Sequence, residues 1–399
     1  MPSLDNGAYL ERYDRSLMGV YGHPKAVLTR GEGCYVWDAD GKRYLDLLAG
    51  IAVNALGHGH PAVVGALTRQ CASLIHVSNF FATAPQIELA ERLVSVAGAP
   101  SGSAVFFANS GTEAIEAAIK LSRRTGRTGL IAARDAFHGR TTGALALTHK
   151  PAYREPFEPL IGSVTRIPLN DKAALRAAVS RDVAALFLEP IQGEAGVVAA
   201  DPAFLRLARE LTTACGTLLI IDEVQTGVGR TGTWFAFQQA GITPDAITVA
   251  KGLGGGVPIG ALVTFGPSVS GLLTAGQHGT TFGGNPLAAA VGLAVLDTIE
   301  ADDLLAHVTS VGNHLVGSVA ALGHPLIRGV RGAGLLRAVT LSADVAALVA
   351  DRALSAGFIV NAPTPDVLRL APPLVITNAQ IDSFVSALPT LLAGLDRAP

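Results

Sequence analysis

Two charged residues each close an apolar, β-prone run of this 399-residue chain. Asp222 follows the run 218–221, and Lys251 follows the run 247–250. Short apolar runs of this kind predict buried strands. Open α/β sheets bind ligands in the crevice at the carboxyl ends of their strands. The carboxylate and the amine are therefore expected to point into one crevice.

An Asp and a Lys in these places suit pyridoxal phosphate. This cofactor needs a lysine to form its Schiff base and a carboxylate to keep its ring nitrogen protonated. The lysine must lose its proton before it can attack an aldehyde, so it requires desolvation or a cationic neighbour. A salt bridge between two strand ends is the alternative interpretation. The two residues alone favour that alternative, because charges at strand ends are common.

A segment at residues 109–120 follows a predicted strand and opens a predicted helix. Gly111 and Thr112 offer backbone N–H groups and a hydroxyl at the helix N-terminus, which suits a phosphate group. Ser110 and Glu113 have the spacing of a capping box. Capping alone is the commoner explanation of such a string, and a phosphate site is favoured only beside the Asp–Lys pair.

Three further segments, each next to a predicted strand or helix, carry side chains that could bind a cofactor or substrate. Phe137 is placed to stack on a pyridine ring, and Arg140 is placed to clamp a substrate carboxylate; a core Phe and a surface Arg fit the spacing equally well. Glu189 and Glu194 follow another predicted strand and fit either acid–base catalysis or solvated loop charges. Residues 279–286 are rich in hydroxyls and glycines, which fits a second phosphate contact or only a tight loop.

Residues 227–232 match the pattern GxGxxG. A true dinucleotide fingerprint follows a strand directly, opens a crossover helix and finds its acid at the end of the next strand. Here the charged residues 222–225 intervene, and the candidate acid, Asp245, precedes the next predicted strand. The match is therefore rejected as a dinucleotide site.

Residues 104–260 alternate predicted strands with predicted helices. This pattern implies an α/β fold with a mostly parallel sheet covered by helices on both faces. The predicted strands are Ala104–Phe107, Gly129–Ala133, Ser163–Ile167, Val183–Leu188, Thr217–Ile221 and Ala246–Ala250.

The rest of the chain is predicted to surround this sheet with helices and a smaller α+β domain. Its predicted elements are a helical arm at 1–30, a hairpin at Cys34–Asp46, helices at 62–76, 84–97 and Leu287–Glu300, and strands at Gly334–Leu341 and Val367–Leu370. The predicted domains are an arm and hairpin at 1–55 joining the small domain, a large cofactor-binding domain at 56–290, and the small domain at 291–399.

Composition excludes several classes of protein. Hydrophobic residues make up 49% and charged residues 16% of the chain, which is typical of packed globular proteins. The net charge of −2 gives no electrostatic case for nucleic acid. The three cysteines lie far apart and fit neither a disulfide framework nor a metal site. With no apolar run long enough for a membrane span and no signal-peptide pattern at the N-terminus, a cytoplasmic protein is expected.

Taken together, these motifs resemble the class III aminotransferases, fold-type I pyridoxal-phosphate enzymes, and within them the acetylornithine/ornithine group. The resemblance covers nearly the whole chain, and the string Asp222–Gln225 followed by Lys251 is its most specific part. The matching stretches, in the family's order, are Asn109–Lys120, Phe137–Arg140, Glu189–Gly196, Ile221–Gly232, Ala250–Gly260, Gly279–Pro286 and Leu368–Pro372.

The resemblance implies roles around the cofactor. Lys251 resembles the lysine that binds pyridoxal phosphate covalently and then serves as base for the 1,3-proton shift, and Asp222 the partner of the ring nitrogen. Gln225 is implied to reach the ring hydroxyl. The remaining implied cofactor contacts are Val224 and Phe137 on the ring, Gly111 and Thr112 on the phosphate, and Thr281 on the phosphate of the neighbouring subunit.

It also implies roles toward substrate. Arg140 would hold the donor carboxylate, with Thr280 nearby. Arg369 resembles the arginine that binds the carboxylate of glutamate or 2-oxoglutarate, and Glu194 the switch that neutralises it while the ornithine-type donor is bound. The implied protein is a homodimer with shared active sites that needs no metal.

The expected activity is ω-amino transfer from N2-acetyl-L-ornithine to 2-oxoglutarate in arginine biosynthesis. The alternatives are a related ω-aminotransferase using ornithine, succinylornithine, 4-aminobutyrate or a diamine, a non-catalytic scaffold on the same fold, and a nicotinamide dehydrogenase using residues 227–232. Phe80 and Phe81 stand where relatives often carry a tyrosine near the substrate entrance, so the donor preference is open at this point.

Overall fold

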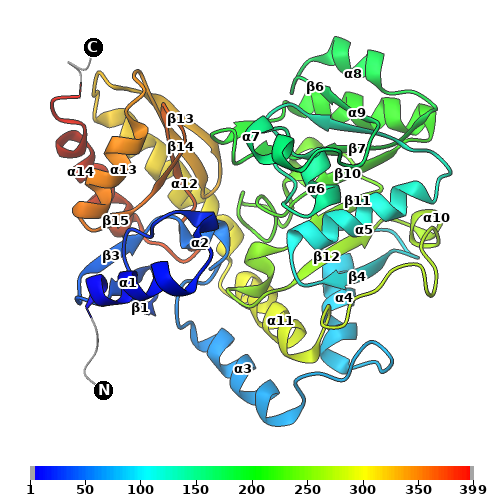
Figure 1. Cartoon of the computed structure of the whole chain (residues 1–399), viewed down its shortest axis with the longest axis horizontal. Helices are drawn as coiled ribbons and strands as arrows, with labels where there is room; N and C mark the ends of the chain where they lie inside the picture. Colours follow the sequence, from blue (N-terminus) through cyan, green and yellow to red (C-terminus); the bar gives the residue numbers. More distant parts are fainter. Residues whose placement is uncertain (1–4, 396–399) are drawn as a thin grey trace.

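A computed structural model describes residues 5–395 of the chain (Figure 1). Its centre is a seven-stranded sheet in the order β4-β12-β11-β10-β7-β5-β6. The strands are β4 (Ala104–Ala108), β5 (Gly129–Ala133), β6 (Val164–Ile167), β7 (Val183–Leu188), β10 (Leu218–Asp222), β11 (Ala246–Val249) and β12 (Gly260–Thr264). The α/β fold with a mostly parallel sheet is confirmed; β12, antiparallel to both of its neighbours, was not predicted.

The central strands β7 and β10 are apolar up to the terminal Asp222, because helices cover both faces of the sheet. Every residue of β7 and β10 is buried. Side chains alternate along a strand, so Leu219 and Ile221 of β10 join the larger hydrophobic cluster, whereas Leu218 and Ile220 join the smaller one on the other face. Helix α9 (Pro202–Cys215) packs into the first cluster and α5 (Gly111–Arg123) into the second.

The helices predicted at 62–76, 84–97 and Leu287–Glu300 are confirmed. Their observed ends differ from the predicted ones by one to three residues or not at all. The observed helices are α3 (Pro61–Ser73), α4 (Ala84–Val96) and α11 (Pro286–Ala301). Asn285 caps α11, since its side chain accepts a hydrogen bond from the amide of Ala288 at 2.9 Å. The lower part of Figure 1 shows α3 projecting from the body of the protein.

Two four-stranded sheets lie beside the central sheet, on the left of Figure 1. One has the order β1-β2-β3-β15 and joins the N-terminal hairpin to a C-terminal strand. The other has the order β13-β14-β17-β16. Their strands are β1 (Leu28–Glu32), β2 (Tyr35–Asp38), β3 (Arg43–Asp46), β13 (Ile327–Ala333), β14 (Leu336–Leu341), β15 (Phe358–Ile359), β16 (Asn361–Thr364) and β17 (Val367–Leu370).

The hairpin is confirmed, but the arm is helical only in part. Helix α1 (Asn6–Ser16) ends well before the predicted boundary, and β1 occupies residues expected to belong to the arm. β1 pairs with β2, and the guanidinium of Arg30 lies 4.5 Å from the ring centroid of Trp37. Tertiary pairing therefore decides the conformation of this polar segment.

The remaining elements complete the fold. They are the 3-10 turns η1 (Gly19–Tyr21), η2 (Glu155–Phe157), η3 (Ala236–Ala240) and η4 (Lys251–Gly254); the helices α2 (Ala49–Ala52), α6 (Thr142–Leu147), α7 (Pro151–Arg154), α8 (Lys172–Ala178), α10 (Pro267–Ser270), α12 (Leu304–Ala321), α13 (Ala346–Ser355) and α14 (Asn378–Leu392); and the strands β8 (Ile191–Gln192) and β9 (Val198–Ala199). No helix within residues 5–395 has the length and apolar character needed to cross a membrane.

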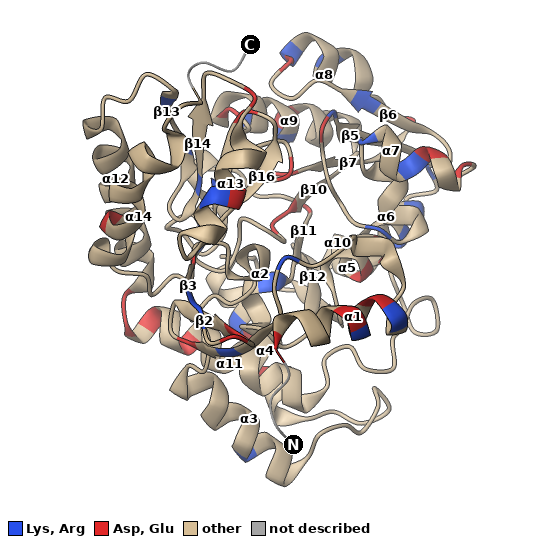
Figure 2. Ribbon diagram, turned by 60° about the vertical axis from the view of Figure 1, so that its left-hand side comes forward, with Lys and Arg blue, Asp and Glu red and all other residues tan. Residues whose placement is uncertain are grey.

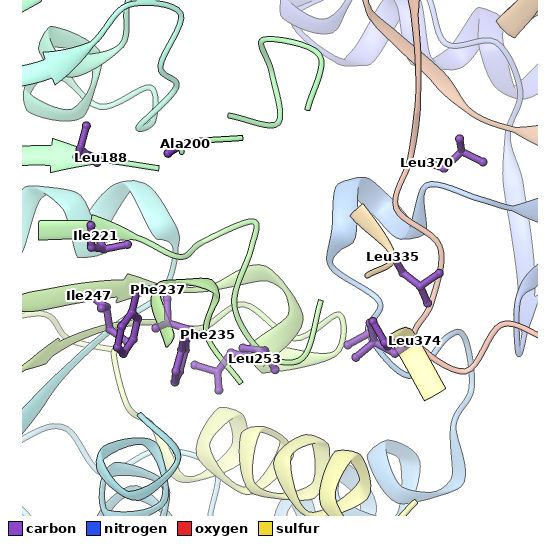
Figure 3. Close-up of a cluster of buried hydrophobic side chains, with 14 of the residues drawn as sticks. Leu188, Ala200, Ile221, Phe235, Phe237, Ile247, Leu253, Leu335, Leu370 and Leu374 are labelled. Carbon is purple, nitrogen blue, oxygen red and sulfur yellow. The ribbon is translucent and has the colours of Figure 1, made fainter. Parts of the chain in front are cut away.

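The larger hydrophobic cluster continues from the sheet into the C-terminal elements. Figure 3 shows Ile221 and Phe235 on the sheet side and Leu335 and Leu374 on the other. The segment 227–232, which matched GxGxxG, forms turns here and opens no helix. Its buried Arg230 donates to the backbone carbonyls of residues 335 and 372, so this segment ties the sheet to the C-terminal elements.

Candidate active site

Asp222 and Lys251 lie at the carboxyl ends of two adjacent parallel strands. Asp222 is the last residue of β10 and pairs in register with Thr248 of β11. Lys251 opens the turn η4 immediately beyond β11. Both side chains line one cavity of about 400 Å³. The structure thus places the acid and the amine in a single crevice at the ligand-binding edge of the sheet.

The surroundings of Lys251 favour a nucleophilic amine. Burial lowers the pKa of Lys251 from 10.5 to about 8, and this effect outweighs the opposing influence of the Glu194 carboxylate. A sizeable fraction of the amine is therefore neutral at physiological pH. Its backbone is in the left-handed region with φ of 44°, a strained conformation for a non-glycine residue that is common at functional sites.

Asp222 is held by three hydrogen-bond partners. Its Oδ1 accepts from the Val224 amide at 3.0 Å and from the Thr248 hydroxyl at 3.1 Å. Its Oδ2 lies 2.7 Å from Nδ1 of His138, whose side chain is fully buried. Within the described part of the chain, Nε2 of His138 has no hydrogen-bond partner. The carboxylate is thus fixed in one orientation.

His138 is a site residue that the sequence analysis missed. It lies inside the Phe137–Arg140 motif, but its partner Asp222 is 84 positions away in the sequence. No spacing rule connects two such positions. Only the adjacency of β5 and β7, and of β7 and β10, brings the loops that carry them together.

The N-terminus of α5 forms one wall of the cavity. Ser110 accepts a hydrogen bond from the Glu113 amide at 3.3 Å, but the Glu113 carboxylate turns to the Asn109 amide, so only half of the predicted capping box forms. Gly111 and Thr112, in the first turn of the helix, line the cavity. A Cβ at position 111 would lie 2.8 Å from Val224, so only glycine permits this close approach.

Phe137, Val224, Gln225 and Arg140 also line the cavity. The amide of Phe137 donates to the carboxylate of Glu189 at 3.1 Å. Glu189 is buried, and burial together with the nearby Asp222 charge raises its pKa well above the usual value. The site therefore disfavours the charged form of Glu189.

Arg369 of β17 is fully buried. Its Nη1 donates to the carboxylate of Glu194 and to Oε1 of Gln225, the latter at 3.2 Å. Its Nε donates to Oδ1 of Asn361 at 3.0 Å. Burial opposes ionisation of Glu194, but the charge and the hydrogen bond of Arg369, together with Lys251 and Gln225, outweigh it and lower the pKa of Glu194. The carboxylate and the guanidinium therefore form a closed ion pair.

One donor of Arg369 is left over. In the described residues its Nη2 is buried and has no hydrogen-bond partner. An unpaired donor on a buried cation is costly, so it marks a place where a further acceptor is expected. The Arg369 guanidinium lies next to the cavity, because Gln225 lines the cavity and accepts a hydrogen bond from Arg369.

The structure does not bring Thr280 and Thr281 into the cavity of this chain. The Thr280 hydroxyl accepts from Nδ2 of Asn109 at 3.2 Å. Thr281 is exposed and lines a separate small depression next to residues 76–86. This placement is compatible with a role toward a second copy of the chain.

The residues fit pyridoxal phosphate. A partly neutral buried lysine, a fixed carboxylate and a glycine-containing helix N-terminus open into one cavity, as the cofactor's aldehyde, ring nitrogen and phosphate require. Within residues 5–395, no cluster of three or more His, Cys, Asp or Glu side chains could hold a metal ion.

Comparisons with known proteins agree with this chemistry. The sequence model of the family "Aminotransferase class-III" matches residues 19–392. The acetylornithine aminotransferase of Streptomyces coelicolor is 54% identical over 390 residues, covering 98% of this chain and 96% of that relative.

Two solved structures are similar over almost the whole chain. A Toxoplasma gondii ornithine aminotransferase, described with partial occupancy of PLP at its active site, has a TM-score of 0.91 at 31% identity and covers 98% of this chain and 95% of its own. The acetylornithine aminotransferase of Elizabethkingia anophelis has a TM-score of 0.85 at 35% identity, covering 97% and 99%.

Proposed function

The chain belongs to the class III aminotransferases, which are pyridoxal-phosphate-dependent transaminases, and we propose that its reaction is the transfer of the δ-amino group of N2-acetyl-L-ornithine to 2-oxoglutarate. The products are N-acetylglutamate 5-semialdehyde and glutamate, a step of arginine biosynthesis. The observation that carries the proposal is the ion pair between the buried Arg369 and the partly exposed Glu194, next to the cavity that holds Lys251 and Asp222. A buried cation with a displaceable partner lets one site accept two unlike substrates in turn.

The cavity residues are proposed to divide the work on the cofactor. The cofactor supplies an electron sink when bound. Lys251 holds it covalently and moves the proton, and Asp222 keeps the ring nitrogen protonated. The remaining contacts are Gln225 at the ring hydroxyl, Val224 and Phe137 on the ring faces, and Gly111 and Thr112 at the phosphate.

Substrate carboxylates are proposed to bind at two arginines. Arg140 holds the carboxylate of acetylornithine, with Thr280 of the partner subunit nearby. Arg369 holds that of glutamate or 2-oxoglutarate after Glu194 moves away. The partly exposed side chain of Glu194, 36% of which is accessible, leaves it room to move, whereas Arg369 is held at Nε by Asn361.

We further propose a cytoplasmic homodimer in which Thr281 of the partner subunit contacts the phosphate. Large apolar side chains are exposed on this chain, among them Phe80 at 93% and Phe81 at 68%. Figure 2 shows α3 almost free of charge, and Arg69 is its one charged residue. Exposed apolar surface of this kind is typical of protein interfaces. The division into domains at 1–55, 56–290 and 291–399 is part of the same proposal.

Amino-donor profiling with 2-oxoglutarate tests the proposal. Acetylornithine is expected to give the highest kcat/KM among acetylornithine, ornithine, succinylornithine, 4-aminobutyrate and putrescine. A higher value for any of the other four would identify the chain as a different ω-aminotransferase of the class. Absence of amino transfer from every donor by the cofactor-loaded protein would favour a scaffold role.

The pKa of Lys251 predicts how the apoprotein takes up pyridoxal phosphate. The neutral amine is the reactive form, and it predominates above its pKa of about 8. The rate of covalent capture, followed by stopped-flow absorbance, should rise about tenfold per pH unit below this value and level off above it. Nα-acetyl-lysine amide, with its ordinary pKa, is the control and should keep gaining rate up to about pH 10. The same profile for both amines would contradict the shifted pKa.

Removal of the His138 hydrogen bond should weaken cofactor binding. A hydrogen bond to a buried carboxylate contributes about 1.5–3 kcal/mol, so His138→Phe should raise the Kd for pyridoxal phosphate about 10- to 100-fold, measured by equilibrium dialysis. His149→Phe is the matched control, because His149 also pairs with an aspartate, Asp135, at the protein surface. Equal effects of the two substitutions would show that His138 does not act through Asp222.

A further inference from the structure

The guanidinium of Arg140 is stacked on an aromatic ring outside the cofactor cavity. Its Cζ lies 3.5 Å from the ring centroid of Tyr153 and 5.7 Å from that of Phe137. Among residues 5–395 the Arg140 side chain has neither an ion pair nor a hydrogen bond with another residue. Its position is therefore set by aromatic stacking.

Tyr153 is itself held in place. It lies in the short helix α7, and its ring meets Phe137 edge-on at 6.5 Å between centroids. The next residue, Arg154, donates to the carbonyl of His149 at 2.9 Å and pairs with Glu158. Contacts of Arg154 with residues before and after Tyr153 in the sequence thus fix the segment that carries the Tyr153 ring.

The stack stands between two cavities. Phe137 lines both the cofactor cavity and a neighbouring cavity of about 800 Å³, Arg140 lines the first, and Tyr153 lines the second. Stacking occupies a face of the planar guanidinium and leaves its N–H edge free. That edge is the part that binds a carboxylate through two parallel hydrogen bonds.

We propose that Tyr153 is a positioning residue that selects donors carrying a carboxylate next to the acylated amine. The inference rests on the proposed function, in which Arg140 binds that carboxylate. Tyr153 holds the guanidinium edge toward the cofactor cavity, so a donor with a carboxylate finds its partner already oriented. An ω-amine without the carboxylate gains nothing from this arrangement.

The test compares acetylornithine with N-acetylputrescine, which is the same molecule without the carboxylate. A cation–aromatic contact of this kind changes affinity by about tenfold. Tyr153→Leu should therefore raise KM for acetylornithine about tenfold and leave its kcat within about twofold. The same variant should leave kcat/KM for N-acetylputrescine unchanged within about twofold.

Two further variants complete the experiment. Tyr153→Phe keeps the ring and should retain the wild-type KM for acetylornithine. A raised KM would show that the hydroxyl is needed as well as the ring. Phe157→Leu removes an exposed aromatic ring four positions from Tyr153. It should leave kcat/KM unchanged for both donors. Equal losses with both donors, or no loss with acetylornithine, would overturn the proposal. If the wild-type protein does not distinguish the two donors at all, it is the proposed donor role of Arg140 that fails.

Discussion

Lys251→Ala is expected to reduce amino transfer by about 10⁴-fold or more. Lys251 is the cavity amine whose pKa burial brings to about 8, and it is proposed to supply both the covalent attachment and the proton transfer. General acid–base catalysis alone is worth about 10²- to 10⁴-fold, and loss of the nucleophile adds to it. The measurement is kcat for acetylornithine with saturating pyridoxal phosphate.

Two variants separate the chemistry of Lys251 from its charge. Lys251→Arg keeps a cation at this position but holds its proton too tightly to act as a nucleophile or base, so it should be as inactive as the alanine variant. Lys172→Ala removes an exposed lysine at the start of α8 and should keep full activity.

Borohydride reduction gives an independent answer. The reduced wild-type protein should carry the cofactor on the peptide that contains residue 251, as detected by mass spectrometry, and Lys251→Ala should carry none there. Added methylamine should restore part of the activity of Lys251→Ala, because a small amine can fill the space and move the proton. More than about 1% residual activity without the added amine would show that another group performs the proton transfer.

Local rules were sufficient for the strands that carry the central acid and amine. The runs that precede Asp222 and Lys251 are apolar, short and bounded by turn residues. They form the buried strands β10, which includes Asp222, and β11, which ends two residues before Lys251. The parallel crossover places both strand ends at one edge. The predicted strands agreed with the structure for this reason, and so did the position of the cavity.

Features that depend on tertiary pairing could not be read from the sequence. β12 follows the glycine-rich turn η4 and reverses the chain, and nothing in its residues specifies an antiparallel direction. The contact of Arg369 with Gln225 joins positions 144 apart. Asn361 reaches Arg369 only because β16 pairs with β17 in register. Side-chain types indicate chemistry at such positions, but partners require the fold.

Arg369→Leu is expected to separate the two half-reactions. Truncating one partner of a buried, hydrogen-bonded charge pair costs about 2–5 kcal/mol, so kcat/KM for glutamate should fall about 30- to 3,000-fold. The half-reaction with acetylornithine should change by less than about threefold, since the donor carboxylate is proposed to bind at Arg140. Single-turnover absorbance changes of the cofactor report each half-reaction on its own.

Glu194→Ala should have the opposite effect on selectivity. The Glu194 carboxylate occupies Arg369 in this structure, and its lowered pKa keeps it ionised at neutral pH, so it competes with the incoming glutamate carboxylate. Its removal leaves Nη1 of Arg369 bonded only to Gln225 and Nη2 still without a partner among the described residues, while Asn361 still holds Nε. The KM for glutamate should then fall about tenfold, and KM for acetylornithine should rise because an unpaired cation now faces the donor. Parallel changes in both half-reactions, for either substitution, would mean that the pair stabilises the site and does not switch between substrates.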